Sequence, residues 1–261
     1  MIKLIDSHAH YDDGRFEKEV AGGADAALDI SFEAGVEAVS NVATNLDNAR
    51  TTLALAEKYP DVYAAIGIHP SDCQEMDGTA NEILSATEAL LSHPKVVAIG
   101  EIGLDYYWEP YDKERQKAFF EGQLEIAKRL DLPVIIHCRE AIGDAVEIVR
   151  RHEGVRGVFH SFSGSAETAR ELVSLGWYIS FGGPITYKGA KKVREAAAAV
   201  PLDRLLIETD CPYLPPVPHR GEINYSAYML FTLAAMAEAV GCEEEKLAKR
   251  LVENTKKLFG I

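Results

Sequence analysis

Short apolar runs alternate with longer stretches of helical character along the whole chain. The runs are rich in Val, Ile, Leu and Ala, and each has the length of a single strand. Apolar runs without polar alternation are typical of strands buried on both faces of a parallel sheet. We therefore expect eight strands, at Lys3–Asp6, Val36–Ala43, Val62–Ile68, Lys95–Gly100, Leu132–His137, Val155–His160, Trp177–Phe181 and Leu205–Glu208.

The stretches between these runs predict helices. The clearest are expected at about Asp25–Glu33, Leu46–Lys58, Glu114–Leu130 and Glu243–Leu258. Pro60 and Pro94 each follow a helical stretch at a point where proline cannot continue a helix. Ser165 is the expected N-cap of a further helix, with Gly176 just beyond its end.

The number of strand–helix units decides between two α/β architectures. Eight units in 261 residues predict a single-domain (β/α)₈ TIM-type barrel over residues 1–261. The alternative, an open doubly wound sheet, predicts a glycine-rich phosphate turn after the first strand. That position holds Asp6-Ser-His-Ala-His10, and the first glycine is Gly14. The pattern therefore favours the barrel.

Composition excludes several classes of protein. Hydrophobic residues make up 47% and charged residues 26%, which is ordinary for a folded globular chain and argues against a disordered or fibrous one. The formal net charge is −14. An acidic chain does not coat nucleic acid or an anionic membrane through bulk charge, although it can still carry a local phosphate site.

Cysteine usage and the first residues suggest a compartment. Four cysteines are widely spaced and form no C-x-x-C pair, so we expect reduced thiols rather than a thiolate metal site or a redox motif. The chain reaches Asp6 too early for the apolar region of a secretion signal, and no apolar run approaches about 18 residues. We expect a cytoplasmic protein with no membrane partner, and the oligomeric state stays open.

Imidazole and carboxylate side chains lie at or just after the predicted strand ends. They are His8, His10, His69, Glu101, His137, His160 and Asp210. In a barrel the carboxyl ends of all strands meet at one face, where active sites lie. Residues two apart in a strand point to the same side, so His8 and His10 can reach one ion. The alternative is that such histidines are hydrogen-bonded core residues.

This donor set predicts metal ions. Imidazole and carboxylate ligands suit zinc, manganese, iron or nickel, and carboxylates also suit magnesium. Four histidines with Glu101 and Asp210 are more than one tetrahedral ion needs. One carboxylate that bridges two ions would use the whole set, as in two-metal phosphate-cleaving sites with ions about 3.5–4 Å apart. We expect two divalent metal ions (Zn, Mn or Mg).

Six motifs occur in order along the chain. They are Asp6-Ser-His-Ala-His10, Ala65-Ile-Gly-Ile-His-Pro70, Ile99-Gly-Glu-Ile-Gly-Leu-Asp-Tyr-Tyr107, Val134-Ile-Ile-His-Cys-Arg139, His160-Ser-Phe-Ser-Gly164 and Ile207-Glu-Thr-Asp-Cys-Pro-Tyr213. Together they resemble the TatD family of metal-dependent deoxyribonucleases, within the amidohydrolase superfamily. The resemblance covers essentially the whole chain and implies a TIM-type barrel with a binuclear site.

The resemblance also implies individual roles. His8, His10 and Asp210 would hold one ion, and His137 and His160 the other, with Glu101 as the bridge. It places His69 and Asp105 near the scissile phosphate and its metal site, and Arg139 and Ser163 near the substrate. One segment departs from the family pattern. The stretch from Arg220 to Ser226 keeps a glycine and an asparagine but lacks the basic residues and the Glu-Pro expected there.

These roles predict hydrolysis of DNA phosphodiester bonds by a metal-activated water, as an exonuclease on single strands. Glu101 would bridge the ions, and Asp210 would accept the proton of the water. His69 would hydrogen-bond the phosphate or the leaving oxygen, unless it is a structural residue ahead of Pro70. Asp105 would orient a ligand or contact the substrate region, unless it is a simple turn residue.

Cations and aromatic residues after the strands suggest contacts with a single DNA strand or another nucleic acid. The cations are Arg139, Lys188, Lys191, Lys192, Arg194 and Arg220. They can grip phosphates locally, although those near residue 190 can equally be a solvated helix start. Tyr106, Tyr107 and Trp108 can stack on bases or pack over the barrel mouth.

Two other functions stay open. One is hydrolysis of a carboxylic ester or amide at the same metal site, including removal of a D-amino acid from tRNA, an activity that the resemblance also allows. A barrel that binds metal and nucleic acid without turnover is a different class of protein. The complete set of expected ligands favours an enzyme, because a binding protein does not need all six.

Overall fold

The chain divides into two compact units, and the computed structural model describes residues 2–261. Among the described residues, unit 1 consists of 2–41 and 160–261, so it is built from two separate parts of the sequence. Unit 2 is the continuous segment 42–159. Both units alternate strands with helices in the chain order expected from the apolar pattern.

Unit 1 contains parallel strands covered by helices. Its strands are β1 (Leu4–Ala9), β2 (Val36–Val42), β7 (Tyr178–Phe181) and β8 (Leu205–Ile207). Strand β1 pairs with β2, and β7 pairs with β8. A parallel bridge between Ala9 and Cys211 joins the end of β1 to the segment after β8. Within this unit the strand order is therefore β7–β8–β1–β2.

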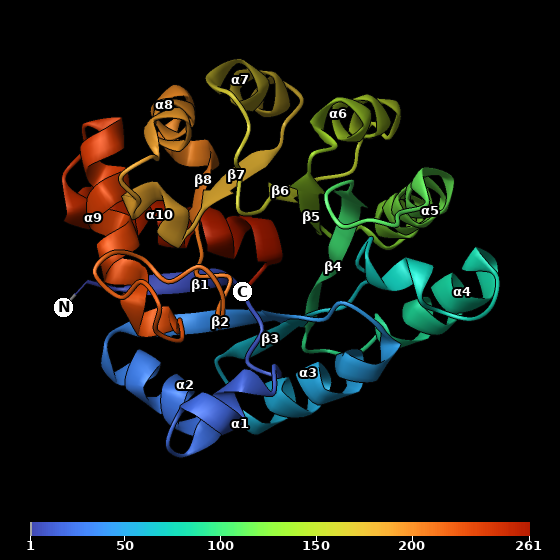
Figure 1. Ribbon diagram of the computed structural model, residues 1–261, viewed down its shortest axis with the longest axis horizontal. Helices are drawn as coiled ribbons and strands as arrows, with labels where there is room; N and C mark the ends of the chain where they lie inside the picture. Colours follow the sequence, from blue (N-terminus) through green and yellow to red (C-terminus); the bar gives the residue numbers. More distant parts are fainter. Residues whose placement is uncertain (1) are drawn as a thin grey trace. The chain divides into compact units, whose positions relative to one another are not determined.

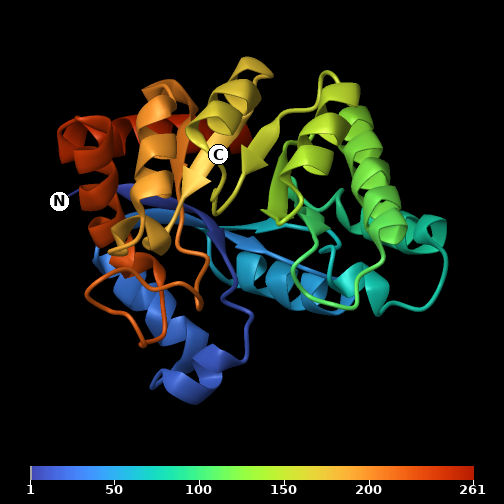
Figure 2. The ribbon, with the colours of Figure 1, turned by 45° about the horizontal axis from the view of Figure 1, so that its top comes forward.

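The helices of unit 1 follow the same alternation. They are α1 (Arg15–Glu19), α2 (Gly23–Glu33), α7 (Ala166–Ser174), α8 (Lys191–Ala199), α9 (Met229–Val240) and α10 (Glu244–Phe259), with short 3₁₀ helices η2 (Gly183–Thr186), η3 (Leu202–Arg204) and η4 (Ser226–Tyr228). Helices α7, α8 and α9 lie side by side, as Figures 1 and 2 show from two directions. Large side chains such as Trp177, Phe181 and Leu28 are buried in the core of this unit.

Unit 2 has four strands in the order β3–β4–β5–β6, and all are parallel. They are β3 (Val62–Ala65), β4 (Val96–Asp105), β5 (Val134–Arg139) and β6 (Gly157–Phe159). The helices are α3 (Leu46–Lys58), α4 (Ala80–Leu90), α5 (Lys113–Leu130) and α6 (Ile142–Arg151), with the 3₁₀ helix η1 (Asp72–Gln74). Helix α5 packs along β4, and its Phe119, Phe120 and Leu124 are buried.

Local sequence signals explain where the helices begin and end. Asn45 and Thr79 each form a capping box at the start of α3 and α4. Ser165 caps α7 by accepting a hydrogen bond from the backbone N–H of Thr168, as predicted. Helix α3 ends at Lys58, two residues before Pro60, as predicted.

Several predicted strand ends are wrong. We expected the fourth strand to end before Glu101, but β4 continues to Asp105 because Ile102 and Leu104 extend its buried pattern. Glu101 is therefore a mid-strand residue, and Asp105 is the strand end. The third strand is shorter than expected, because β3 stops at Ala65 although the following residues stay buried.

Gly103 allows β4 and β5 to approach closely. Its φ is +135°, and a Cβ built there would lie 2.0 Å from the carbonyl oxygen of His137. The pairing register of β4 with β5 also shifts between Ile99 and Ile102. This irregular part of β4 places Glu101 and Asp105 beside β5, where His137 lies.

Candidate functional site

The first candidate cluster lies at the end of β1 in unit 1. The Nε2 atoms of His8 and His10 are 3.0 Å apart. Asp210 Oδ1 lies 3.8 Å from His8 Nε2 and 3.5 Å from His10 Nε2. One donor atom of each residue lies within 4.8 Å of the others, so the set suits one metal ion. Both histidines are buried.

Backbone pairing holds this cluster together across the sequence. The N–H of Asp210 donates to the carbonyl of His8, and the N–H of His10 donates to the carbonyl of Cys211. Asp210 has a φ of +58°, so the backbone turns sharply at this residue. Burial raises the pKa of the Asp210 carboxyl, but the hydrogen bond from His10 and the nearby imidazoles lower it by more. The net pKa of Asp210 is therefore below its usual value.

Asp6 links β1 to the segment after β8 through hydrogen bonds. Its carboxylate accepts hydrogen bonds from the backbone N–H groups of His8 and Thr209 and from the hydroxyls of Thr209 and Ser226. Asp6 is completely buried, and burial raises its pKa to about 6 despite these four donors. The carboxylate positions residues on either side of the cluster without being part of it.

His160 and Glu208 lie next to the same cluster. The rings of His8 and His160 stack with centroids 3.9 Å apart. Glu208 Oε1 is 3.5 Å from His160 Nδ1 and accepts a 2.5 Å hydrogen bond from the backbone N–H of Ser161. From the sequence we expected Glu208 only as a strand residue. The signal was present, since a carboxylate in an apolar strand that leads to Asp210 needs a polar partner.

The second candidate cluster lies in unit 2 and consists of His69, Glu101 and His137. Glu101 Oε1 is 2.8 Å from His137 Nδ1 and 3.7 Å from His69 Nε2. One donor atom of each residue again lies within 4.8 Å of the others. The resemblance predicted Glu101 and His137 as metal ligands and placed His69 at the phosphate.

Hydrogen bonds orient both rings of this second cluster. Asp105 Oδ2 lies 2.9 Å from His137 Nε2, which directs Nδ1 of that ring toward Glu101. Burial raises the pKa of Asp105, but the His137 contact and the N–H of Tyr107 lower it more, with a net pKa below its usual value. His69 Nδ1 accepts from the backbone N–H of Ser71. In the neutral ring the proton then lies on Nε2, so His69 presents a donor toward Glu101.

Two buried glutamines hold the backbone of this cluster, and neither was predicted from the sequence. Gln116 exchanges two hydrogen bonds of 2.8 Å with the backbone N–H and carbonyl of Asp105. Gln123 does the same with Ile68, the residue before His69, at 2.7 and 3.1 Å. The glutamines are seven residues apart on α5 and therefore lie on one face of the helix.

The expected substrate contacts fall into both units. In unit 2, Tyr106 is half-buried, and its hydroxyl donates to Asp144 at 2.8 Å. Burial and this hydrogen bond raise the pKa of Tyr106, so the phenol stays neutral. Arg139 at the end of β5 lies over the ring of Tyr107. In unit 1, Ser163 is exposed on the loop before α7.

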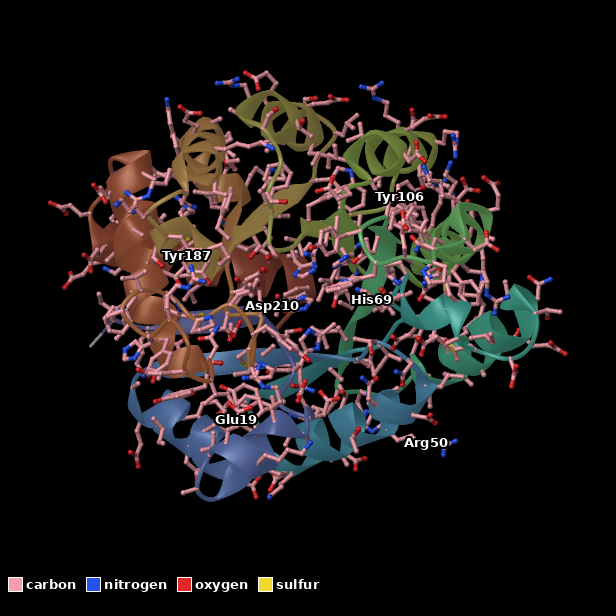
Figure 3. All side chains as sticks on the ribbon, viewed as in Figure 1. Glu19, Arg50, His69, Tyr106, Tyr187 and Asp210 are labelled. Atoms are coloured by element: carbon pink, nitrogen blue, oxygen red, sulfur yellow. The ribbon has the colours of Figure 1, made fainter. Side chains whose placement is uncertain are left out.

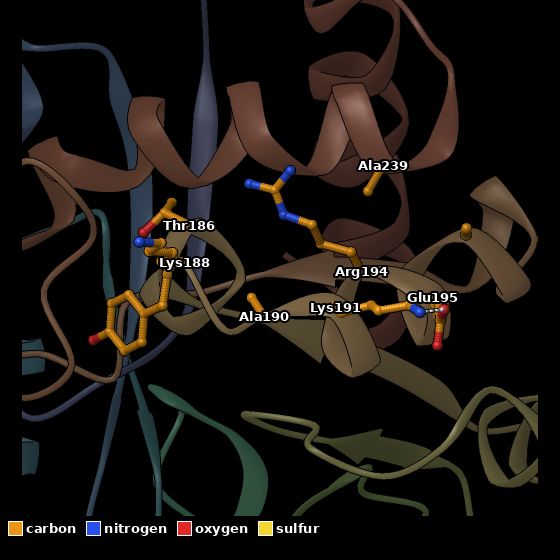
Figure 4. Close-up of a pocket in the computed structure, with 9 residues that line it drawn as sticks. Thr186, Lys188, Ala190, Lys191, Arg194, Glu195 and Ala239 are labelled. Carbon is orange, nitrogen blue, oxygen red and sulfur yellow. Dashed lines mark ion pairs between the residues drawn. The ribbon is translucent and has the colours of Figure 1, made fainter.

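The cations near residue 190 are partly neutralised. Lys191 pairs with Glu195 at 3.8 Å, and Arg194 pairs with Glu238 at 3.0 Å. Residues of η2, α8 and α9 line a pocket of about 530 Å³ in unit 1, shown in Figure 4 with Lys188 at its side. Lys191, Lys192 and Arg194 lie on the first turns of α8, as the helix-start alternative expected. Binding of DNA by Lys188 and its neighbours stays a prediction.

Arg220 packs against an aromatic ring of the same unit. Its guanidinium lies 4.1 Å from the ring centroid of Tyr187. Figure 3 labels Tyr187 and Asp210 of unit 1, and His69 and Tyr106 of unit 2. Asn224 on the segment after Arg220 donates to the carbonyls of Thr209 and Tyr213, so the asparagine kept in this divergent segment has a structural role.

The comparison with known proteins identifies the family. Residues 5–260 match the family described as TatD related DNase. The chain belongs to the TatD-related DNase family. It is 40% identical over 260 residues to the uncharacterized metal-dependent hydrolase YabD of Bacillus subtilis, with 99% of each chain covered. It is 38% identical to the uncharacterized metal-dependent hydrolase YjjV of Escherichia coli, covering 100% of this chain and 99% of the other.

Solved structures of TatD relatives confirm the fold class. The crystal structure of YjjV from Escherichia coli has a TM-score of 0.91 and 36% identity, with 99% of this chain and 98% of that chain covered. A TatD family hydrolase from Entamoeba histolytica, at 22% identity and a TM-score of 0.84, shares the fold. The predicted α/β barrel of eight parallel strands with helices is therefore confirmed. The prediction of one domain over residues 1–261 stays a prediction.

Family membership and the two clusters agree on the general chemistry. The chain is a metal-dependent hydrolase of the TatD-related DNase family, with buried His, Glu and Asp clusters suited to metal ions. No helix within residues 2–261 combines the length and the apolar character needed to cross a membrane.

Proposed function

We propose that this chain hydrolyses phosphodiester bonds of DNA, acting as an exonuclease on single strands with two divalent ions. The observation that carries the proposal is the pair of compact donor clusters, one in each unit, in a chain of the TatD-related DNase family. In the first cluster two imidazoles and a carboxylate suit Zn²⁺ or Mn²⁺, and in the second His137 and Glu101 supply the same kinds of donor, with His69 beside them. These donors support the two-ion proposal.

The fit of each cluster to a metal ion follows from its hydrogen bonds. His8 and His10 direct their Nε2 atoms to one point beside the Asp210 carboxylate. His137 directs Nδ1 to Glu101 because Asp105 holds its other nitrogen. A bound divalent ion supplies an activated water at neutral pH and stabilises the negative charge that develops on the phosphate.

The protein groups then have separable tasks. The Asp210 carboxylate accepts the proton of the attacking water. His69 donates its Nε2 proton to a phosphate or leaving oxygen, a role supported by the Ser71 N–H at its Nδ1. Asp105 keeps His137 in one orientation. The assignment of Glu101 to both ions stays a prediction from the resemblance.

The test is turnover by metal-free protein supplied with Mg²⁺, Mn²⁺ or Zn²⁺ in turn. Substrates are an end-labelled single-stranded oligonucleotide, its duplex, and a D-aminoacyl-tRNA. We expect stepwise shortening of the single strand, slower attack on the duplex, and no deacylation of the tRNA. Deacylation without any DNA cleavage would replace the proposal with ester hydrolysis, and inactivity toward all three would refute it.

A further inference from the structure

The loop between β4 and α5 exposes two large aromatic side chains. Tyr107 is 49% exposed and Trp108 is 59% exposed. Their ring centroids are 4.8 Å apart, with the ring planes nearly perpendicular. By contrast, Tyr106 is engaged with the protein, since it stacks on Tyr111 and its hydroxyl donates to Asp144. The exposed pair is therefore not required to fill the core of unit 2.

A cation accompanies the exposed pair. The Arg139 guanidinium carbon lies 3.7 Å from the ring centroid of Tyr107 and 5.2 Å from that of Trp108. This stacking holds the long arginine side chain beside the two rings. In a chain with a net charge of −14, the surface that combines these residues joins flat apolar faces with a fixed positive charge. That combination suits a ligand that has both an aromatic face and an anionic group.

The aromatic pair is tied to the second donor cluster through one carboxylate. Asp105 Oδ1 accepts the backbone N–H groups of Tyr107 at 2.9 Å and of Trp108 at 3.4 Å. Its other oxygen lies 2.9 Å from His137 Nε2. The loop and the candidate metal ligand therefore share one buried anchor, and the aromatic pair is held at a fixed place relative to His137.

We propose that Trp108, Tyr107 and Arg139 form a stacking platform for one unpaired base of the DNA strand, with the arginine beside a phosphate of the same strand. This proposal rests on the proposed function and specifies how the enzyme selects single strands. Bases in a duplex are stacked and paired, so only an unpaired base offers its face to Trp108. Stacking on an aromatic ring tolerates every base, so the platform selects strandedness and not sequence.

The test compares wild type with Trp108→Ala, with Trp108→Phe as the conservative variant and Leu130→Ala as the control. Leu130 is an exposed apolar residue at the end of α5, in the same unit. Substrates are a labelled single-stranded oligonucleotide, the same strand with one abasic nucleotide placed in turn at each position near the cleaved end, and bis(p-nitrophenyl) phosphate, which has no base.

We expect Trp108→Ala to raise KM for the intact strand about tenfold, with a smaller change in kcat, because one stacked base contributes at this scale. In Trp108→Ala, the ratio of kcat/KM for the oligonucleotide to kcat/KM for bis(p-nitrophenyl) phosphate should fall by at least the same factor, because the second substrate has no base to stack. Trp108→Phe restores most of the loss, and Leu130→Ala matches wild type. An abasic nucleotide at one position raises KM of wild type by a similar factor but adds little in Trp108→Ala.

Two results would overturn the platform. One is an unchanged KM for Trp108→Ala, and the other is an abasic effect of full size that persists in that variant. Binding of a fluorescein-labelled oligothymidylate to metal-free protein, followed by anisotropy, separates this proposal from hydrolysis. If wild type binds the oligothymidylate but cleaves no DNA, and Trp108→Ala binds it more weakly, the platform is supported and the nuclease activity is refuted. Absence of both binding and cleavage by wild type refutes both.

Discussion

Replacing Gln123 with leucine removes a buried amide that holds the backbone before His69. The side chain accepts from the N–H of Ile68 at 2.7 Å, donates to its carbonyl at 3.1 Å, and also donates to the carbonyl of Phe119 at 3.2 Å. Gln123 is fully buried and Ile68 nearly so, at 1% exposure. Water therefore cannot replace the lost partners.

The expected loss of stability follows from these unpaired groups. Each buried polar group left without a partner costs about 1–3 kcal/mol, and the Ile68 N–H and carbonyl both lose theirs. Leucine has a similar volume and returns part of this by burying apolar surface. We expect Gln123→Leu to lower the free energy of unfolding by about 2–4 kcal/mol. For a urea m-value of about 3 kcal/mol per M, the unfolding midpoint falls by about 1 M.

The assay is urea unfolding followed by circular dichroism and by tryptophan fluorescence, with Lys128→Leu as the control on the exposed side of α5. A control shift within about 0.5 kcal/mol is expected for a surface substitution. Gln123→Glu adds a second check. The carboxylate of this variant can accept from the Ile68 N–H, but only its protonated form can donate to the Ile68 carbonyl. The free energy of unfolding of Gln123→Glu, relative to wild type at the same pH, should therefore increase as the pH falls. A Gln123→Leu midpoint equal to that of Lys128→Leu would refute the role of the amide.

Three further predictions concern metal binding and thiol chemistry. Glu101→Ala should abolish turnover and lower the amount of bound metal measured by mass spectrometry, while the circular dichroism spectrum is retained. The surface substitution Glu75→Ala should change neither turnover nor bound metal. Near-wild-type turnover of Glu101→Ala at saturating metal would exclude its role. Glu208→Ala should weaken zinc binding about 10–100-fold in a competition with a chromophoric chelator, because the Glu208 carboxylate orients the His160 ring. Glu208→Gln should retain most of the affinity. Equal zinc affinity of both variants and wild type would contradict this role. Burial raises the pKa of the Cys73 thiol to about 12, so about one molecule in 10⁴ carries its thiolate at pH 8. Iodoacetamide should therefore modify the partly exposed Cys242 well before Cys73 in native protein, with the order lost in urea, and rapid labelling of Cys73 without urea would show that it is accessible.

Much of the fold follows from patterns that act locally. The apolar runs locate all eight strands, because strands buried in a parallel sheet need residues without charges. Helix α3 was predicted from Leu46 to Lys58 and has these bounds, since a capping asparagine and a following proline define both ends. The end of β4 was not predicted. Glu101 looked like a strand terminus, whereas the apolar residues after it continue the strand.

Part of the candidate site could also be predicted from local sequence patterns, and part could not. Proximity of His8 and His10 could be predicted from their spacing alone, because residues two apart in a strand share a side. The tasks of Gln116, Gln123 and Glu208 could not. Their partners lie 11, 55 and 47 residues away in the sequence. A buried polar side chain signals that it needs a partner, but neither a helical amide nor the Glu208 carboxylate shows which backbone group it will meet. Such contacts depend on packing between elements, which a local pattern does not describe.

The discontinuity of unit 1 has a consequence for the order in which the donors become available during synthesis. His8 and His10 leave the ribosome first, but their partner Asp210 and the Ser226 hydroxyl that fastens Asp6 follow about two hundred residues later. The donors of unit 2 lie within residues 69–137 of one continuous segment. We therefore expect a nascent chain to complete the His69–Glu101–His137 cluster well before the cluster at the end of β1, so that capture of metal by the two clusters is separated in time.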